Sequence, residues 1–66
     1  MKITLNGEAR ELDEDASVTD LLEMLQVQSR QVAVEVNLEL VPRHQHTARM
    51  LASGDRVELV TLVGGG

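Results

Sequence analysis

The apolar and polar positions of the chain change their spacing twice, and each spacing predicts a different kind of element. In residues 2–5 apolar and polar side chains alternate in steps of two, as in a half-buried strand. Asn6 and Gly7 follow, and both residue types tolerate a positive φ, so the pair predicts a tight hairpin turn. We therefore expect a second, short strand at about residues 9–12.

A helix is predicted after the acidic loop of residues 13–16. Ser17 is a typical N-cap residue, and Asp20 stands three positions later, as in a capping box. The polar stretch of residues 26–31 predicts a connection after the helix. Between Ser17 and this connection, the apolar residues recur at i, i+3, i+4 and i+7, which places them on one helical face. They are Val18, Leu21, Leu22 and Leu25.

Strand spacing returns in the second half of the chain. Residues 32–36 alternate and are rich in β-branched side chains, so they predict a strand, followed by a turn at 37–39 and a short return strand at 40–41. Pro42 has no backbone N–H to donate to a ladder, so it is expected to end that strand or to mark a sheet edge.

The last third of the chain predicts one irregular segment and one long strand. Residues 43–52 are expected to hold a short helix or a 3₁₀ turn, and residues 53–55 a turn. Residues 56–63 are almost continuously apolar, which is typical of a strand covered on both faces. In the irregular segment, the apolar side chains expected on one side are Ala48, Leu51 and Ala52.

Together these elements predict an α+β domain. One helix can cover only one face of a sheet, so the helix is expected to pack on one side of the strands. We expect a folded domain over residues 1–63 and a flexible glycine tail over residues 64–66. The order of the strands in the sheet does not follow from the pattern.

Composition narrows the range of functions. A chain of 66 residues buries only ~60% of its unfolded surface on folding, which leaves little room for a deep catalytic cleft. The net charge of −5 and the absence of Phe, Trp and Tyr argue against phosphate contacts and base stacking, and so against nucleic acid. Cysteine is absent, and no apolar run approaches the ~20 residues that span a bilayer. We therefore expect a cytoplasmic protein with no signal peptide and no membrane contact.

No constellation of side chains points to catalysis or to a metal. We find no paired acid and base, no activated nucleophile and no phosphate loop, so no catalytic residue is expected. His44 and His46 form an H-x-H pair, but a metal site needs three or four ligands, and the chain has no cysteine and no further histidine. Both histidines are therefore expected on the surface, and no metal is expected to bind.

The chain closes with Gly64, Gly65 and Gly66, directly after its longest predicted strand. A frayed terminus or residues left by cloning would account for them as readily as a function would. The functional interpretation is that a tail without Cβ atoms can be threaded into another enzyme's active site, where its carboxylate is activated. Of Leu62 and Val63, beside the tail, one is expected in the core, and the other is expected to offer apolar contact to partners.

Three segments of the chain match patterns of a known family: Met1–Glu8, Val34–Arg43 with its Asn-x-Glu-x-Val-Pro-Arg order, and Gly54–Gly66. The last is the most specific, because it combines a Gly-Asp turn, an apolar strand and a terminal Gly-Gly. With these segments the chain resembles the ThiS family, the sulfur carriers of thiamine biosynthesis, which are related to the molybdopterin synthase small subunit. The resemblance implies a β-grasp (ubiquitin-like) fold, with a mixed sheet of four to five strands and one main helix on one face.

The resemblance also implies a mechanism. An E1-like adenylyltransferase would use ATP and Mg²⁺ to adenylate Gly66, sulfur from a persulfide donor protein would displace AMP, and thiazole synthase would receive the sulfur of the resulting thiocarboxylate. In this scheme Gly66 is the modified residue, while Gly64 and Gly65 form the thin tail that enters the partner's active site. The chain itself would bind no cofactor, and it would be a co-substrate and not an enzyme.

Three other functions stay open. The same terminal chemistry could deliver sulfur to molybdopterin, tRNA or cysteine synthesis, and the surface that meets the partner would decide the route. The chain could also be a protein modifier that is joined through its C-terminus to lysines of its targets. In the third case it is an interaction domain whose glycine tail is inert.

Overall fold

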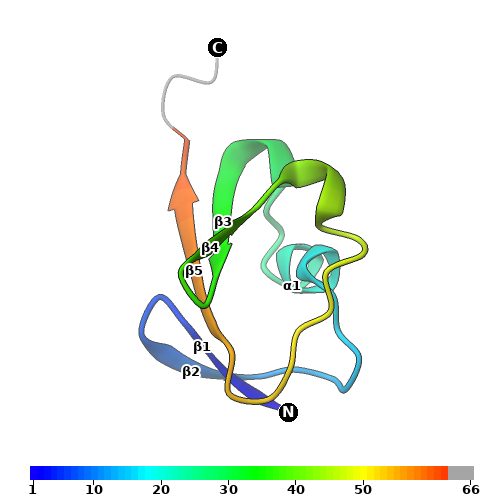
Figure 1. The fold of residues 1–66 in the computed structure, drawn as a ribbon, viewed down its shortest axis with the longest axis vertical. Coiled ribbons are helices and arrows are strands. Elements are labelled where there is room, and N and C mark those ends of the chain that lie inside the picture. Colours follow the sequence, from blue (N-terminus) through cyan, green and yellow to red (C-terminus); the bar gives the residue numbers. More distant parts are fainter. Residues whose placement is uncertain (63–66) are drawn as a thin grey trace.

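Within residues 1–62, which the computed structural model describes, five strands form one mixed sheet that a single helix covers on one face (Figure 1). The α+β architecture expected from the sequence is therefore confirmed. The elements are β1 (Lys2–Leu5), β2 (Glu8–Glu11), α1 (Val18–Met24), β3 (Val32–Val36), β4 (Glu39–Val41) and β5 (Arg56–Thr61), with 3₁₀ turns η1 (Ser29–Gln31) and η2 (Arg43–Gln45).

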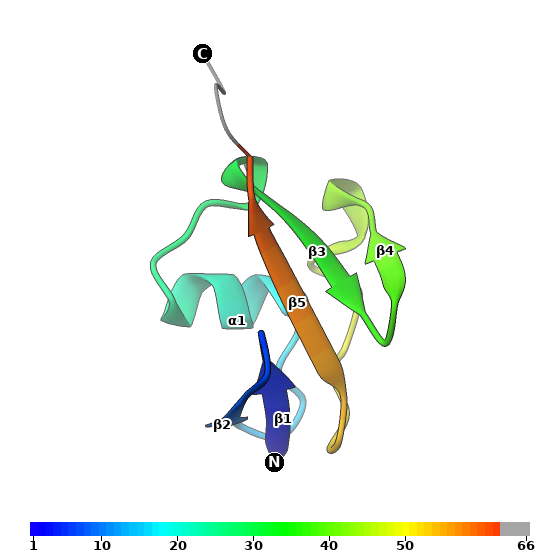
Figure 2. The ribbon, with the colours of Figure 1, turned by 90° about the vertical axis from the view of Figure 1, so that its left-hand side faces the viewer.

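The strand order is β2-β1-β5-β3-β4, so the last strand of the described chain lies at the centre of the sheet. β5 runs parallel to β1 and antiparallel to β3, as Figure 2 shows. It pairs with β3 over its full length, from Val32 opposite Thr61 to Val36 opposite Val57. The ladder with β1 is much shorter and ends at Leu5 opposite Val57.

Two tight turns close the hairpins β1–β2 and β3–β4. Asn6 and Gly7 have φ values of 48° and 84°, as the sequence predicts for this pair. Asn37 and Leu38 also have positive φ values, 53° and 69°, although leucine rarely adopts this conformation. The Asn37 side chain supports the second turn, because its Nδ2 donates to Asp55 Oδ1 at 3.0 Å.

Helix α1 begins with the predicted capping box. The Ser17 hydroxyl accepts from the Asp20 N–H at 3.1 Å, and the Asp20 carboxylate accepts from the Ser17 N–H at 2.9 Å. Two N–H groups at the helix start are thus satisfied. Ser17 itself is 6% exposed, so the cap is built into the protein interior.

The core lies between α1 and the inner face of the sheet. Alternate residues of β3 point inward, and each fully buried Val, Leu or Ile side chain contributes ~1.5–3 kcal/mol to folding. The buried apolar side chains are Ile3, Leu5, Leu12, Ala16, Val18, Leu21, Leu22, Val32, Val34, Val36, Val41, Leu51 and Val57.

The expectation that the last strand is covered on both faces is wrong. Val57 is fully buried, but Val60 is 60% exposed and Leu62 is 51% exposed. Within residues 1–62 the only helix lies on the inner face, and no second layer covers the outer one. The strand also ends at Thr61, two residues before its expected end.

The irregular segment after β4 holds the 3₁₀ turn η2, as expected, but its buried side chains differ from the prediction. Leu51 is buried, whereas Ala48 and Ala52 are exposed. His46 is buried in their place, at 3% exposure. A helical period does not apply here, because the 3₁₀ turn ends at Gln45 and the chain continues without regular structure.

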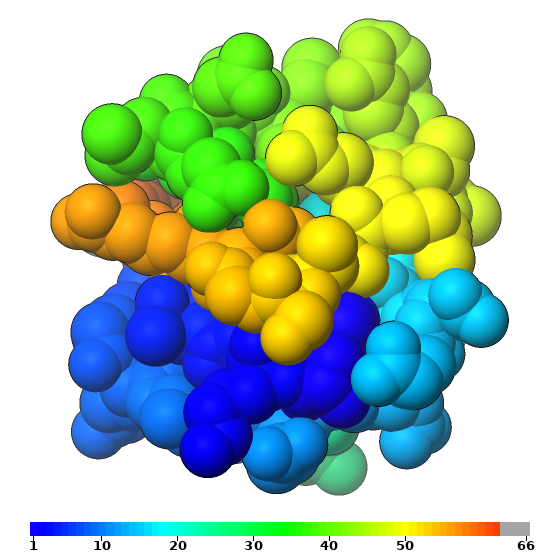
Figure 3. All heavy atoms as spheres, turned by 60° about the horizontal axis from the view of Figure 1, so that its bottom comes forward, coloured from blue at the N-terminus to red at the C-terminus, as the bar shows by residue number. Residues whose placement is uncertain are grey.

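The turn at residues 53–55 packs against the first strand. Gly54 N–H donates to the Lys2 carbonyl at 2.8 Å, and Thr4 N–H donates to the Asp55 carbonyl at 3.0 Å. Figure 3 shows the two segments side by side, with residues near 55 in yellow and orange above the blue strand. This contact sets the point at which β5 begins beside β1.

Replacing Ser17 by alanine is expected to lower the free energy of unfolding by about 1–2 kcal/mol, because the helix start loses the acceptor for the Asp20 N–H. Urea denaturation followed by circular dichroism measures the change. Ser53→Ala, at an exposed turn position, is the matched control and should alter the free energy by less than about 0.5 kcal/mol. Equal effects of the two substitutions would contradict the stabilising role of the capping box.

Candidate functional site

The site predicted from the sequence is the end of β5 together with the tail that follows it. Val63, Gly64, Gly65 and Gly66 lie outside the described residues, so the roles expected for them stay predictions. Leu62 is the last described residue and is half exposed, as one of the pair beside the tail was expected to be. Its N–H donates to the carbonyl of Gln31 at 2.8 Å, which fastens the chain to η1 immediately before the tail.

The strand that leads to the tail is held on both edges along its first half. β3 pairs with one edge, and on the other edge the Asn6 N–H donates to the Val57 carbonyl at 2.9 Å. The Asn6 side chain then continues the ladder, because its Oδ1 accepts from the Leu59 N–H at 2.8 Å. The first half of β5 is therefore paired on both edges.

The outer face of the sheet is the face that α1 does not cover. Val60 lies opposite Ala33, and Leu40 lies opposite Glu35, so these side chains form neighbouring rows. Leu40 is 65% exposed and Val60 is 60% exposed. Exposed apolar side chains gathered on one face are typical of a surface that contacts a partner. We define the outer face by Ala33, Glu35, Leu40, Glu58, Val60 and Leu62.

Two carboxylates lie opposite each other in the middle of this face. Glu35 of β3 is the register partner of Glu58 of β5, and like charges directly opposite each other destabilise a sheet. Arg56 Nε lies 3.8 Å from Glu58 Oε1, but the arginine is largely exposed and such an ion pair contributes little. The outer face therefore presents an apolar surface with negative charge at its centre, which complements a partner with a basic group.

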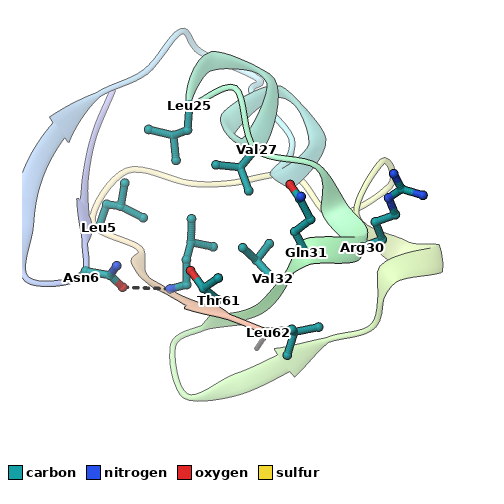
Figure 4. A pocket seen from close by; sticks show the side chains of 10 residues that line it. Leu5, Asn6, Leu25, Val27, Arg30, Gln31, Val32, Thr61 and Leu62 are labelled. Carbon is teal, nitrogen blue, oxygen red and sulfur yellow. Dashed lines mark hydrogen bonds between the residues drawn. The ribbon is translucent and has the colours of Figure 1, made fainter. Parts of the chain in front are cut away.

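A depression of about 980 Å³ opens on the inner side of the end of β5 (Figure 4). Leu25 and Val27, which follow α1, line one side of it, and Leu5 and Asn6 line the opposite side. Thr61 lies between them on β5. The depression exists because α1 ends at Met24 and leaves this end of the sheet uncovered. We call it the tail-base groove; its described lining residues are Leu5, Asn6, Leu25, Val27, Arg30, Gln31, Val32, Leu59, Thr61 and Leu62.

The two histidines do not share one environment, which corrects the expectation that both lie on the surface. His44 is exposed, but His46 is 3% exposed and its Nε2 lies 3.0 Å from the Val41 carbonyl. Because a carbonyl can only accept, Nε2 of His46 must carry the proton in this contact. Its Nδ1 is buried and has no partner within the described part of the chain. His46 thus serves as a core residue that ties η2 to the end of β4.

Residues 1–62 show neither a metal site nor a helix suited to a membrane. They contain no group of three His, Cys, Asp or Glu side chains placed to hold a metal ion. Nor does any helix there combine the length and the apolar character that crossing a membrane requires.

Sequence reasoning missed two features of the site. Asn6 was assigned to the turn alone, whereas its side chain also pairs with β5, 53 residues further along. Arg30 and Thr61, on the tail-base groove, were not singled out at all. No local signal marks them, because the groove forms only where the end of β1, the loop after α1 and β5 come together.

Comparison with known proteins identifies the family. The family model described as ThiS family matches residues 3–66. The sulfur carrier protein ThiS of Escherichia coli (strain K12) is 30% identical over 66 residues, which cover all of both chains. A thiazole synthase of Paramagnetospirillum magneticum is 44% identical over the whole of this chain, which spans 20% of that protein's length.

A solved structure matches as well. The crystal structure of the thiamine biosynthesis protein ThiS of Geobacter metallireducens has a TM-score of 0.85 to this chain and 39% sequence identity, and the match covers all of both chains. This match confirms the β-grasp fold that the resemblance implied, with the five-stranded mixed sheet and one helix seen here. Because the family model covers nearly the whole chain and a relative of the same length agrees from end to end, the protein belongs to the ThiS family.

Proposed function

We propose that this protein is the sulfur carrier for thiazole formation in thiamine biosynthesis, and that the carboxylate of Gly66 holds the sulfur. The observation that carries the proposal is the position of β5. The strand that precedes the three terminal glycines is the central strand of the sheet, and it is followed by an exposed, hydrogen-bonded Leu62. A rigid base and a side-chain-free end suit a terminus that another enzyme must take into its active site.

The chemistry requires an activating partner, because a carboxylate is a poor electrophile. In the proposed route an E1-like adenylyltransferase uses ATP and Mg²⁺ to join the Gly66 carboxylate to AMP, and pyrophosphate leaves. The terminal sulfur of a persulfide donor protein attacks the carbonyl carbon and AMP leaves. A thiol then cleaves the remaining S–S bond, which frees the thiocarboxylate. ATP, Mg²⁺ and the persulfide belong to the partners in this scheme, and this chain supplies the carbonyl carbon.

The outer face suits the docking of such partners. Leu40 and Val60 offer exposed apolar area, and Glu35 with Glu58 offers paired negative charge. A basic side chain of the partner would relieve the repulsion between the two carboxylates, so binding would recover the free energy that the free protein loses there. The net charge of −5 adds long-range attraction to a basic partner.

Thiazole synthase is the proposed acceptor of the sulfur. Two proteins named thiazole synthase contain a segment that matches this whole chain, at 44% and 38% identity, and in each the segment makes up 20% of the protein. A carrier domain within the same polypeptide as the acceptor supports a close working relation between the two. The proposed role is that of a carrier in the cytoplasm and not that of a catalyst.

Intact-mass spectrometry tests the carrier role. Protein coexpressed with its activating enzyme under thiamine limitation is expected to show the exchange of one oxygen for one sulfur, localised to Gly66 by fragmentation. A truncated control that ends at Gly64 should show no exchange. Only unmodified full-length protein would contradict the proposal, and higher-mass conjugates that survive reduction would indicate a protein modifier instead.

Gly65→Val is expected to fold like the wild type but to be adenylated about 100-fold more slowly, because the added branch obstructs the thin tail beside the reacting carbon. The rate of ATP–pyrophosphate exchange with the activating enzyme measures the effect, and circular dichroism checks the fold. Ala52→Val, which adds a similar branch at an exposed position away from the tail, is the control. Equal exchange rates for the two variants would remove the need for a bare chain end.

A further inference from the structure

The end of β5 has one strand edge that no strand within residues 1–62 covers. Leu62 N–H donates to the Gln31 carbonyl, and Asn37 N–H donates to the Arg56 carbonyl. In an antiparallel ladder the bonding residues alternate, so the even-numbered residues of β5 direct their backbone groups at β3. The odd-numbered residues Val57, Leu59 and Thr61 therefore direct theirs at the opposite edge.

Asn6 marks the point at which this opposite edge becomes free. Its backbone N–H occupies the Val57 carbonyl and its side chain occupies the Leu59 N–H. The chain then turns away into β2, and no other strand of the described chain takes its place. The Leu59 carbonyl and both backbone groups of Thr61 are left without a strand partner at this edge.

The free edge lies along the tail-base groove. Leu25 and Val27 line one side of the groove and Leu5 lines the other (Figure 4). All three are half-buried or buried apolar residues. A strand that paired with Thr61 would direct alternate side chains into the tail-base groove. Backbone groups at the edge and apolar pockets beside it are the two elements by which proteins bind an added strand.

The position of the groove along the chain narrows the choice of occupant. Arg30, the one charged residue among the described residues that line the groove, belongs to η1, which meets β5 on its β3 side. The groove wall next to the free edge is therefore apolar. Leu62 lies on the wall of the groove, and Gly66, the residue that reacts in the proposed function, is four positions further along the sequence. A protein that holds the terminal carboxylate must therefore pass close to this edge.

We propose that an extended, apolar segment of thiazole synthase adds to the free edge of β5 as a sixth strand. Thr61 N–H donates to a carbonyl of that segment and the Thr61 carbonyl accepts from one of its N–H groups. Apolar side chains of the segment fill the space beside Leu25. This inference rests on the proposed function. It adds a second contact surface to the outer face, namely the free edge of β5 and the tail-base groove beside it.

The test compares two substitutions at one position. Thr61→Pro removes the N–H at the free edge but breaks no hydrogen bond to β3, because Thr61 directs its backbone groups away from β3. Thr61→Val keeps the N–H and the branched shape. Isothermal titration of the full chain with thiazole synthase is expected to give a Kd about tenfold higher for Thr61→Pro and one within about twofold of the wild type for Thr61→Val.

Hydrogen exchange on the wild-type chain gives a readout that does not depend on the folding of a variant. Binding of thiazole synthase is expected to slow the exchange of the Thr61 amide, while the amide of Ala9, at the outer edge of β2, should keep its rate.

The outcomes separate this inference from the proposed function. An unchanged Thr61 amide in a complex that still forms, or equal Kd values for Thr61→Pro and Thr61→Val, overturns the added strand even where the thiocarboxylate is detected by mass. Protection of Thr61 by the activating enzyme but not by thiazole synthase also overturns it. Absence of the thiocarboxylate with protection of Thr61 intact would overturn the carrier chemistry and leave the binding mode supported.

Discussion

The pairing of β5 with two strands at once is the constraint on which the rest of this structure depends. Val57, at the start of β5, is fully buried between Leu5 of β1 and Val36 of β3 in the sheet register. Without β5, the β1–β2 hairpin and the β3–β4 hairpin would have no common neighbour. The central strand is also the one that leads to the tail, so the same burial that stabilises the sheet fixes the position from which the tail starts.

The short ladder between β1 and β5 gives the two halves of β5 different properties. That ladder ends at Asn6, where the backbone enters a left-handed turn. The side-chain oxygen of Asn6 makes the last contact with β5. Before Leu59, β5 is an interior strand with a neighbour on each side. After Leu59, β5 is an edge strand beside the tail-base groove. Edge strands are usually protected by charge, by proline or by a covering segment. This edge instead lies beside the apolar residues Leu25 and Val27, and that combination favours the binding of an added strand.

The small size of the domain agrees with the chemistry proposed for Gly66, which needs no pocket in this chain. The side chains buried in residues 1–62 are almost all apolar, and the exceptions, Ser17 and His46, cap a helix and tie a loop to a strand. No interior space is left for a set of converging polar groups of the kind that enzymes use. A terminal carboxylate needs no such set in its own chain, because the enzyme that receives it supplies the pocket. The protein then has to provide a fixed exit point and surfaces for docking.

The sequence by itself determined the features that depend on near neighbours. The Asn6-Gly7 turn, the Ser17–Asp20 capping box and the inward alternation of Val32, Val34 and Val36 each involve residues only a few positions apart, and each was read correctly from their spacing. The glycine tail was equally plain in the sequence, as was the resemblance to the family.

Tertiary structure alone decided the strand order, the burial of His46, the exposure of Val60 and the free edge at Thr61. The apolar run of β5 predicted cover on both faces, but cover depends on how many layers the chain can build, and the described chain builds one helix. The end of the β1 ladder depends on Asn6 meeting Leu59 across 53 positions. Contacts at that separation arise only when the whole core packs, so no local pattern of residues encodes them.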